Sequence, residues 1–217
     1  MSDLTIIAEA GVNHNGSLKN ALRLVDIAAK AKADFVKFQT FVPESLVQKN
    51  FKSAKYQKKN SKFLYQYEML KKYQLTIKDH IKIMKRCKKK KIKFLSSPFD
   101  LESIKILKKL KLGTIKVPSG EINNIPYLEE IGRLKKKVIL SSGMANKYEI
   151  DIAINTLKKK GTSIKNISLL HCNTEYPADF LKINLNSIRY LKDRYKIKVG
   201  YSDHTIGFEA ALLSLGM

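Results

Sequence analysis

The sequence predicts an α/β protein of the (β/α)8 TIM-barrel class, truncated to about seven strands. Seven short apolar runs each end in a group of polar residues, and six of them precede a helix-like stretch. An apolar run between helices is typical of a parallel strand buried on both faces. Polar residues at the carboxyl ends of such strands are typical of a barrel active site. The runs span residues 5–9, 35–40, 93–98, 114–121, 138–143, 167–173 and 199–204.

Chain length limits how many strands this barrel can have. The 217 residues suffice for one domain, whereas a complete eight-stranded barrel needs roughly 250. We therefore expect residues 1–217 to form one incomplete barrel domain without an eighth strand. Two strand edges of the buried type would then be unpaired, so we expect the chain to be a fragment of a longer gene product.

The first helix is predicted over residues 17–32. Ser17 is a suitable N-cap, and the apolar side chains that follow recur at helical spacing. The predicted buried stripe is Leu18, Ala21, Leu22, Val25 and Ala29.

A second helix starts at Thr76, where Asp79 completes a capping box. We assign its buried stripe to Ile77, Ile81 and Met84, and this choice places His80 on the surface.

The later helices also have start and stop signals. Asp100 opens a short helix after the third strand, and Asn146 forms a capping box with Glu149. Gly161 is the C′ glycine of the helix that Asn146 opens, whose buried stripe is Ile150, Ala153, Ile154 and Leu157. Two more helices are predicted over residues 181–195 and from residue 208 onward.

An additional segment, residues 41–70, follows the second strand. A segment inserted after a strand's carboxyl end lies on the catalytic face of a barrel, so it is interpreted as a lid or substrate loop. A plain surface excursion is the alternative.

The net charge of +23 raises the question of a nucleic-acid or acidic-membrane partner. The lysine runs 88–91, 135–137 and 158–160 fall at predicted helix ends, where cations complement the helix dipole. We therefore interpret the charge as a solvated surface, and we expect no nucleic-acid and no membrane partner.

No apolar run approaches the roughly 18 residues of a membrane span, and the N-terminus does not resemble a signal peptide. With Cys87 and Cys172 giving no support for a disulfide, the expected location is the cytoplasm.

Two lysines lie inside predicted strands. Lys37 and Gln39 alternate along the second strand and so point the same way, and Lys116 lies within the fourth. A lysine in an apolar strand is costly unless it meets an anion or takes part in chemistry. The two lysines indicate a clamp for phosphate or carboxylate, and Gln39 is a further candidate for substrate binding. A Schiff-base lysine or a lysine reaching to the rim are the alternatives.

Hydroxyl groups and two carboxylates accompany these lysines at the strand ends. Glu9 ends the first strand and Glu121 follows the fourth, so both are candidates for acid–base chemistry. Around His14, a turn held by local hydrogen bonds is one interpretation. His204 is a candidate metal ligand, although a single histidine does not make a site. The hydroxyl groups that offer donors to phosphate oxygens are those of Ser96, Ser97, Ser119, Ser141, Ser142 and Ser202.

Taken in order, seven segments resemble the sialic acid synthase family, phosphoenolpyruvate-dependent condensing enzymes that make nonulosonic acids and include legionaminic and pseudaminic acid synthases. The resemblance covers essentially the whole chain. The matching segments are IIAEAGVNHNGS, FVKFQTF, FLSSPFD, IKVPSGEINNIPYL, VILSSGM, LLHCNTEYP and VGYSDHTIGFEAA.

The resemblance implies a transferase that joins phosphoenolpyruvate to the open-chain aldehyde of an N-acylated mannosamine-type sugar and releases phosphate. By similarity, Glu9, Glu121 and Tyr176 serve catalysis or sugar positioning. His204 is one of two histidines that bind a divalent ion, usually manganese, with magnesium possible. The resemblance implies that the other histidine belongs to an eighth strand and that an antifreeze-like domain closes the sugar site across a homodimer; we expect residues 1–217 to contain neither. The residues that the resemblance assigns to phosphoenolpyruvate are Lys37, Ser97, Lys116, Ser119, Ser141 and Ser202.

The segments HCNTEYP and SAKYQKKN favour a legionaminic-type synthase acting on a 2,4-diacetamido sugar. N-acetylmannosamine is a close alternative, and the EAGVNHNG start fits pseudaminic acid synthases less well. The rival functions are a Schiff-base barrel aldolase using Lys116, a non-catalytic truncated barrel that binds phosphosugars or a partner, and a basic nucleic-acid binder.

Overall fold

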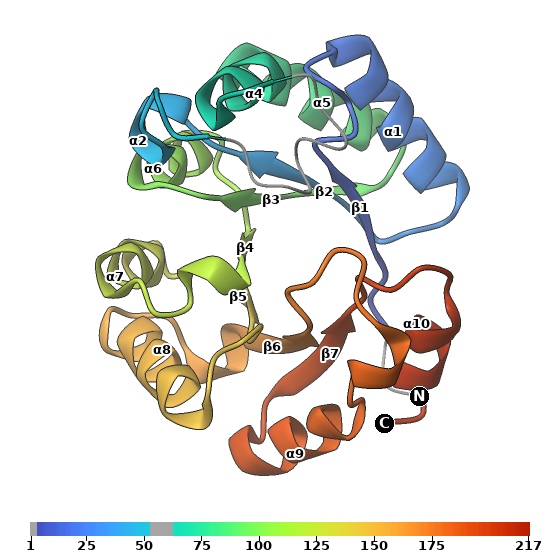
Figure 1. Cartoon of the computed structure of the whole chain (residues 1–217), viewed down its shortest axis with the longest axis vertical. Coiled ribbons are helices and arrows are strands. Elements are labelled where there is room, and N and C mark those ends of the chain that lie inside the picture. The colour runs from blue at the N-terminus through green and yellow to red at the C-terminus, as the bar shows by residue number, and fades with distance from the viewer. Residues whose placement is uncertain (1–3, 53–62) are drawn as a thin grey trace. The chain divides into compact units, whose positions relative to one another are not determined.

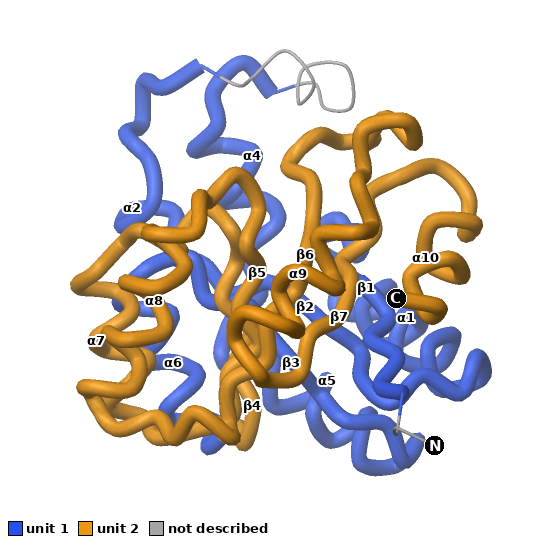
Figure 2. The backbone as a smooth tube through the Cα atoms, turned by 90° about the horizontal axis from the view of Figure 1, so that it is seen from below, with its two compact units in different colours: residues 1–111 blue, residues 112–217 orange. Residues whose placement is uncertain are grey.

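The computed structural model describes residues 4–52 and 63–217. Helices follow each strand along these residues, with α2, α4 and α5 between β2 and β3, and every pairing between the named strands is parallel. The described residues divide into two compact units, residues 1–111 and 112–217 (Figure 2). No helix within the described ranges is long and apolar enough to cross a membrane.

Unit 1 contains a three-stranded parallel sheet in the order β1-β2-β3 (Figure 1). Its strands are β1 (Ile7–Gly11), β2 (Phe35–Thr40) and β3 (Lys93–Pro98). The helices are α1 (Leu18–Lys30), α2 (Pro43–Leu46), α4 (Gln66–Tyr73), α5 (Ile77–Lys89) and α6 (Leu101–Lys109).

Unit 2 contains a four-stranded parallel sheet in the order β4-β5-β6-β7 (Figure 1). Its strands are β4 (Thr114–Val117), β5 (Lys137–Ser141), β6 (Ile167–Cys172) and β7 (Lys198–Ser202). The α-helices are α7 (Ile125–Arg133), α8 (Lys147–Lys159), α9 (Asn186–Tyr195) and α10 (Glu209–Ser214). Three short 3-10 helices are η1 (Ser119–Glu121), η2 (Ile164–Asn166) and η3 (Phe180–Lys182).

The predicted helix starts are confirmed by their hydrogen bonds. Ser17 Oγ accepts from the Asn20 amide, and Asp100 accepts from the Ser103 amide. Both capping boxes form, one at Thr76 and one at Asn146. Each of these bonds satisfies an amide that the first helical turn would otherwise leave without a partner.

The predicted buried face of α5 is wrong. Ile77 and Ile81 are exposed, and the buried face consists of His80, Ile83 and Cys87. Both sets have helical spacing, so apolar periodicity alone could not choose between them. His80 is fully buried rather than on the surface, because unit 1 offers it hydrogen-bond partners inside the core.

Two further elements differ from the prediction. The segment 181–195 is not one helix, because Asn184 takes a positive φ of 40° and separates η3 from α9; asparagine tolerates that conformation better than most residues. The fourth strand ends at Val117, and Ser119–Glu121 turn into η1 instead of continuing it.

Apolar side chains between helices and sheet form the core of each unit. In unit 1, α1 lies beside α5, and Arg86 binds Asp26 across the two helices through Nε and Nη2 at 2.8 and 2.5 Å. In unit 2, all four residues of the predicted α8 stripe are buried. Positive charge gathers where helices end, as expected, and five helix ends close on a lysine with a positive φ. These are Lys32, Lys91, Lys111, Lys135 and Lys196.

Candidate active-site clusters

Glu9, Lys37 and Ser97 form the first cluster, here called the unit 1 cluster, on the three neighbouring strands of unit 1. Lys37 Nζ lies 2.6 Å from Glu9 Oε2 and 3.4 Å from Ser97 Oγ. Only 13% of the Lys37 side chain is exposed, against 53% for Glu9. The lysine therefore meets one carboxylate and one hydroxyl at the carboxyl ends of the strands, where the sequence predicted an anion clamp.

Backbone geometry at the end of β1 sets where the Glu9 carboxylate lies. The pairing of β1 with β2 shifts register between Glu9 and Gly11, and Gly11 has a φ of +51°. A Cβ at this position would stand 3.2 Å from Glu9 Oε1. Such an irregularity re-aims a side chain at a strand end, and a glycine here leaves room for the carboxylate.

Ser96 and Ser97 do not share a face, because successive residues of a strand point to opposite sides. Ser97 approaches Lys37, whereas Ser96 Oγ lies 2.7 Å from Thr40 Oγ1 in the core. Ser96, one of the hydroxyl groups expected to offer a donor to phosphate, therefore lies in the core, away from Lys37. Gln39 is the register partner of Ser97 and lies on the Lys37 side of β2.

Lys116 is the centre of the second cluster, here called the unit 2 cluster. It is 6% exposed, and its Nζ donates to Ser141 Oγ at 2.6 Å and to the Val117 carbonyl at 2.9 Å. Burying an ammonium costs several kcal/mol unless polar groups surround it. Lys116 is therefore a buried lysine held in the sheet by one hydroxyl group and one backbone carbonyl.

Ser119 stands close to the backbone of the loop after β5. Gly143 has a φ of +54°, and a Cβ there would lie 2.4 Å from Ser119 Cβ. Only a residue without a side chain fits, so Gly143 fixes the distance between this loop and Ser119. Glu121 ends η1 and accepts from Asn124 Nδ2 at 2.7 Å, a contact that turns its carboxylate toward the start of α7.

Tyr176 and His204 stack with ring centroids 4.1 Å apart, and the Tyr176 hydroxyl lies 3.2 Å from His204 Nε2. His204 Nδ1 lies 2.5 Å from the Asn173 carbonyl oxygen. A carbonyl only accepts, so Nδ1 carries a proton, and in the neutral ring Nε2 has the lone pair. Ser202 Oγ is 3.5 Å from the same Nε2. Sequence reasoning missed the Asn173 carbonyl, because a backbone acceptor leaves no residue-type signal.

A histidine that donates one ring N–H to a backbone carbonyl has an arrangement common among metal ligands. His204 Nδ1 meets this description, and its Nε2 faces the hydroxyl groups of Tyr176 and Ser202. Within residues 4–52 and 63–217, however, no three His, Cys, Asp or Glu side chains gather as a metal site would require. The described residues therefore fit one ligand of a metal ion and not a complete metal centre.

His14 is buried, and its Nδ1 accepts from the Gly16 amide at 3.0 Å. The interpretation as a turn held by local hydrogen bonds is confirmed. Burial, and secondarily the charge of His80, lower the pKa of His14 to about 4. The ring is therefore neutral at physiological pH and is a structural group.

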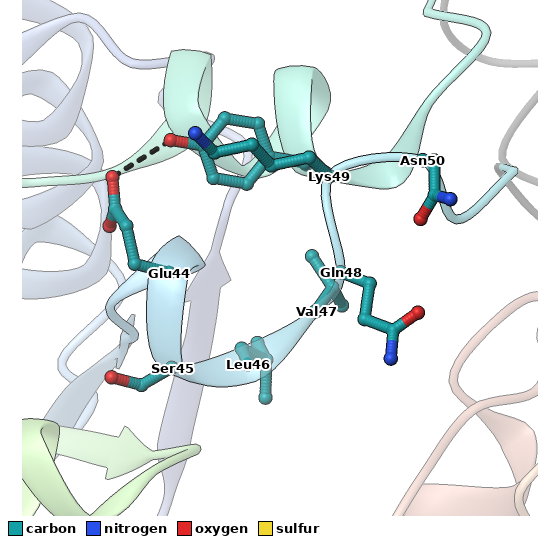
Figure 3. A pocket seen from close by; sticks show the side chains of 8 residues that line it. Glu44, Ser45, Leu46, Val47, Gln48, Lys49 and Asn50 are labelled. Atoms are coloured by element: carbon teal, nitrogen blue, oxygen red, sulfur yellow. Dashed lines mark hydrogen bonds between the residues drawn. The ribbon is translucent and has the colours of Figure 1, made fainter.

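The additional segment after β2 forms a hollow of about 580 Å³ lined by residues 44–50 and Tyr67 (Figure 3). Glu44 Oε1 accepts from the Tyr67 hydroxyl at 2.9 Å and from Lys71 Nζ at 2.8 Å. These bonds, led by that from Lys71, lower the pKa of Glu44 to about 2. None of the predicted site residues lines this hollow. Residues 53–62 of the expected lid, including all of SAKYQKKN, lie outside the described residues.

Curated relatives cover nearly the whole chain. It is 49% identical to the N,N'-diacetyllegionaminic acid synthase of Campylobacter jejuni over 100% of its own length and 65% of that protein. It is 44% identical to the enzyme of the same name from Legionella pneumophila, over 98% of the chain and 60% of the relative. The chain thus spans less than two thirds of the curated relatives it matches.

A solved structure is also similar to nearly the whole chain. The sialic acid synthetase of Leptospira borgpetersenii, solved in complex with citrate, matches 98% of the chain with a TM-score of 0.86 and 36% identity, and 70% of that protein is covered. This similarity and the seven parallel strands confirm the predicted TIM-barrel class, truncated to seven strands. The profile of the NeuB family matches residues 24–217. The chain therefore belongs to the NeuB family, as the seven sequence segments indicated.

Proposed function

We propose that this chain carries the phosphoenolpyruvate-binding part of a nonulosonic acid synthase. The observation that carries the proposal is that the buried Lys116 ammonium donates a hydrogen bond to Ser141 Oγ. Phosphoenolpyruvate is a small trianion, and a desolvated lysine among hydroxyl groups suits it. Lys37 with Ser97 supplies a second lysine–serine pair of the same kind.

The proposed reaction forms a carbon–carbon bond between C3 of phosphoenolpyruvate and the aldehyde carbon of an open-chain N-acyl amino sugar. One water is consumed and inorganic phosphate leaves. Lys37 and Lys116 neutralise the phosphate and carboxylate of phosphoenolpyruvate, and Ser119, Ser141 and Ser202 donate hydrogen bonds to them. Glu9 and Glu121 are the groups that accept or deliver protons at the aldehyde oxygen and the water. Tyr176 positions the sugar.

Manganese or magnesium would polarise the aldehyde when bound. Of the described residues His204 fits such an ion, through Nε2, and a full set of ligands is not among them. The roles proposed for the lysines, serines and glutamates do not depend on that ion. We propose His204 as a ligand without assigning it a step.

For the sugar, we propose the 2,4-diacetamido type used for N,N'-diacetyllegionaminic acid. Both curated relatives described above are named synthases of that acid. N-acetylmannosamine is the competing substrate. A panel of the two sugars with phosphate release as the readout distinguishes them, and a higher kcat/KM for N-acetylmannosamine would reverse the assignment.

The experiment that tests the anion clamp is calorimetric titration of phosphoenolpyruvate into the wild type and into Lys116→Ala. We expect the variant to lose measurable binding while its circular dichroism and cooperative unfolding persist. Lys137→Ala is the matched control, because Lys137 begins the neighbouring strand β5 and is exposed. Unchanged binding in Lys116→Ala would remove Lys116 from the site.

A Schiff-base aldolase is the second candidate, because the same burial of Lys116 suits an imine-forming amine. Incubation with pyruvate and borohydride separates the two functions. An imine would leave a reduced adduct on Lys116 that mass spectrometry detects. We expect no adduct.

The proposal also includes a cytoplasmic location and a homodimer for the full-length protein, with neither nucleic acid nor membrane as a partner. Light scattering on the full-length protein measures its oligomeric state. Retention on heparin with a steep salt dependence would instead support a polyanion partner.

A further inference from the structure

His80 contributes a polar group to an otherwise apolar helix face. The buried residues of α5 are His80, Ile83 and Cys87, and the last two belong to the apolar core of unit 1. The His80 ring meets Phe94 of β3 edge-on, with centroids 6.0 Å apart and an interplanar angle of 84°. An apolar ring would pack here equally well, so the nitrogens of His80 need a separate explanation.

The hydrogen bonds of His80 fix its proton. The Thr76 carbonyl oxygen lies 2.9 Å from Nδ1 and only accepts, so Nδ1 carries the hydrogen. Burial lowers the pKa of His80, and the ring is neutral at physiological pH. Nε2 therefore has a lone pair, and it accepts from the Thr40 hydroxyl at 2.9 Å.

The network continues from Thr40 to the next strand. Thr40 Oγ1 lies 2.7 Å from Ser96 Oγ, and Ser96 Oγ lies 3.2 Å from the Phe38 carbonyl oxygen. Thr40 is near the carboxyl end of β2, and Ser96 is near that of β3. One helix side chain is thus connected to both strand ends through two hydroxyl groups.

Each hydroxyl group of this network is next in sequence to a candidate substrate-binding residue on the Lys37 side of the sheet. Gln39 precedes Thr40 and Ser97 follows Ser96, and Gln39 and Ser97 are register partners. Because alternate residues face opposite sides of a strand, holding Thr40 and Ser96 from the helix side also fixes the backbone that aims Gln39 and Ser97. Buried polar networks, when satisfied, restrict geometry more tightly than apolar packing does.

We infer that His80 is a positioning residue that holds the ends of β2 and β3, so that Ser97 and Gln39 keep their place beside Lys37. The inference rests on the proposed function, in which Lys37 and Ser97 bind phosphoenolpyruvate. His80 itself touches no substrate. It acts through Thr40 and Ser96.

The first arm of the test measures phosphoenolpyruvate affinity. His80→Phe keeps a ring against Phe94 and removes both nitrogens, and we expect it to raise the Kd about five- to tenfold. Thr40→Val should have a similar effect. The double variant should bind no more weakly than either single one, because both break the same link. His80→Gln, whose amide oxygen accepts from Thr40, should restore most of the affinity.

The matched control is Cys87→Ala on the same buried face of α5. It creates a cavity and lowers stability without touching the network. We expect its Kd to match the wild type even where its unfolding temperature falls as far as that of His80→Phe. Equal Kd values in His80→Phe and Cys87→Ala would contradict the inference.

The second arm does not need phosphoenolpyruvate. The Phe99 amide donates to the Thr40 carbonyl at 3.0 Å. In His80→Phe we expect this amide to exchange with deuterium roughly tenfold faster than the loss of global stability predicts, and in Cys87→Ala no faster. If the wild type fails to bind phosphoenolpyruvate, the proposed function is wrong, and the deuterium exchange of the Phe99 amide alone tests the positioning role of His80. Identical exchange in both variants would then overturn the positioning role.

Discussion

Glu9 and Lys37 are register partners on adjacent strands, and their charged atoms lie 2.6 Å apart. The same ammonium is the group proposed to bind phosphoenolpyruvate. In the proposed site, Glu9 would therefore compete with the substrate for Lys37 while supplying a carboxylate beside it. Binding and proton transfer thus place opposite demands on Glu9: binding favours the loss of its charge, whereas proton transfer needs its carboxylate.

Glu9→Gln should separate those demands. Removing the negative charge leaves the Lys37 ammonium more available, so we expect phosphoenolpyruvate to bind roughly three- to tenfold more tightly, a modest gain because Glu9 is half exposed. If Glu9 transfers a proton in the proposed reaction, phosphate release should fall by two orders of magnitude or more. Calorimetry and phosphate release measure the two effects. Glu9→Asp serves as the charge-preserving control, and weaker binding in Glu9→Gln would contradict the competition.

Stability should fall as pH decreases from 7 to 5. Unfolded histidine has a pKa near 6.5, whereas His14 has about 4 in the folded chain. Between these values the unfolded state binds a proton that the folded state does not, so acid favours unfolding, by about 2 kcal/mol over this interval. Urea unfolding at both pH values measures it. His14→Asn keeps an acceptor for the Gly16 amide and should reduce the difference; an unchanged pH dependence would exclude His14 as its source.

Gly143→Ala should destabilise unit 2 and displace Ser119. The added Cβ would overlap Ser119 at a positive φ, and we expect a loss of roughly 1–3 kcal/mol together with weaker phosphoenolpyruvate binding. Gly113→Ala is the control, since a Cβ there meets nothing within 4 Å. Thermal unfolding compares the two. Equal stabilities would mean that the loop after β5 moves aside freely.

Three histidines should show tautomers dictated by backbone carbonyls. His204 and His80 donate from Nδ1, to Asn173 and Thr76, whereas His171 Nε2 lies 2.6 Å from the Ile183 carbonyl and so donates from that nitrogen. Long-range nitrogen–proton correlation spectra above neutral pH distinguish these forms. An Nε2–H form of His204 would remove the lone pair proposed for a metal ion.

Much of the fold could be predicted because its signals are local. Buried parallel strands are continuous apolar runs, and capping boxes need residues only three positions apart. The strands 35–40 and 93–98 and the caps Thr76 and Asn146 were predicted correctly for this reason.

The rotation of α5 could not be predicted in the same way. His80 is buried because its partner Thr40 lies 40 residues earlier, and Thr40 meets Ser96 a further 56 residues on. A hydrogen bond between distant residues leaves no periodic pattern, and Ile77 and Ile81 offered an equally regular alternative stripe. Strand alternation, by contrast, could have separated Ser96 from Ser97 at the outset.

Replacing the five lysines with positive φ by glycine should raise the thermal stability of this protein. A left-handed backbone costs an L-residue roughly 1–2 kcal/mol and costs glycine almost nothing. All five close helix ends that lead into the amino ends of strands, whereas the proposed site residues belong to the carboxyl ends. Glycines at these five positions would make the chain more heat-resistant and less basic, and they would leave the unit 1 cluster and the unit 2 cluster intact.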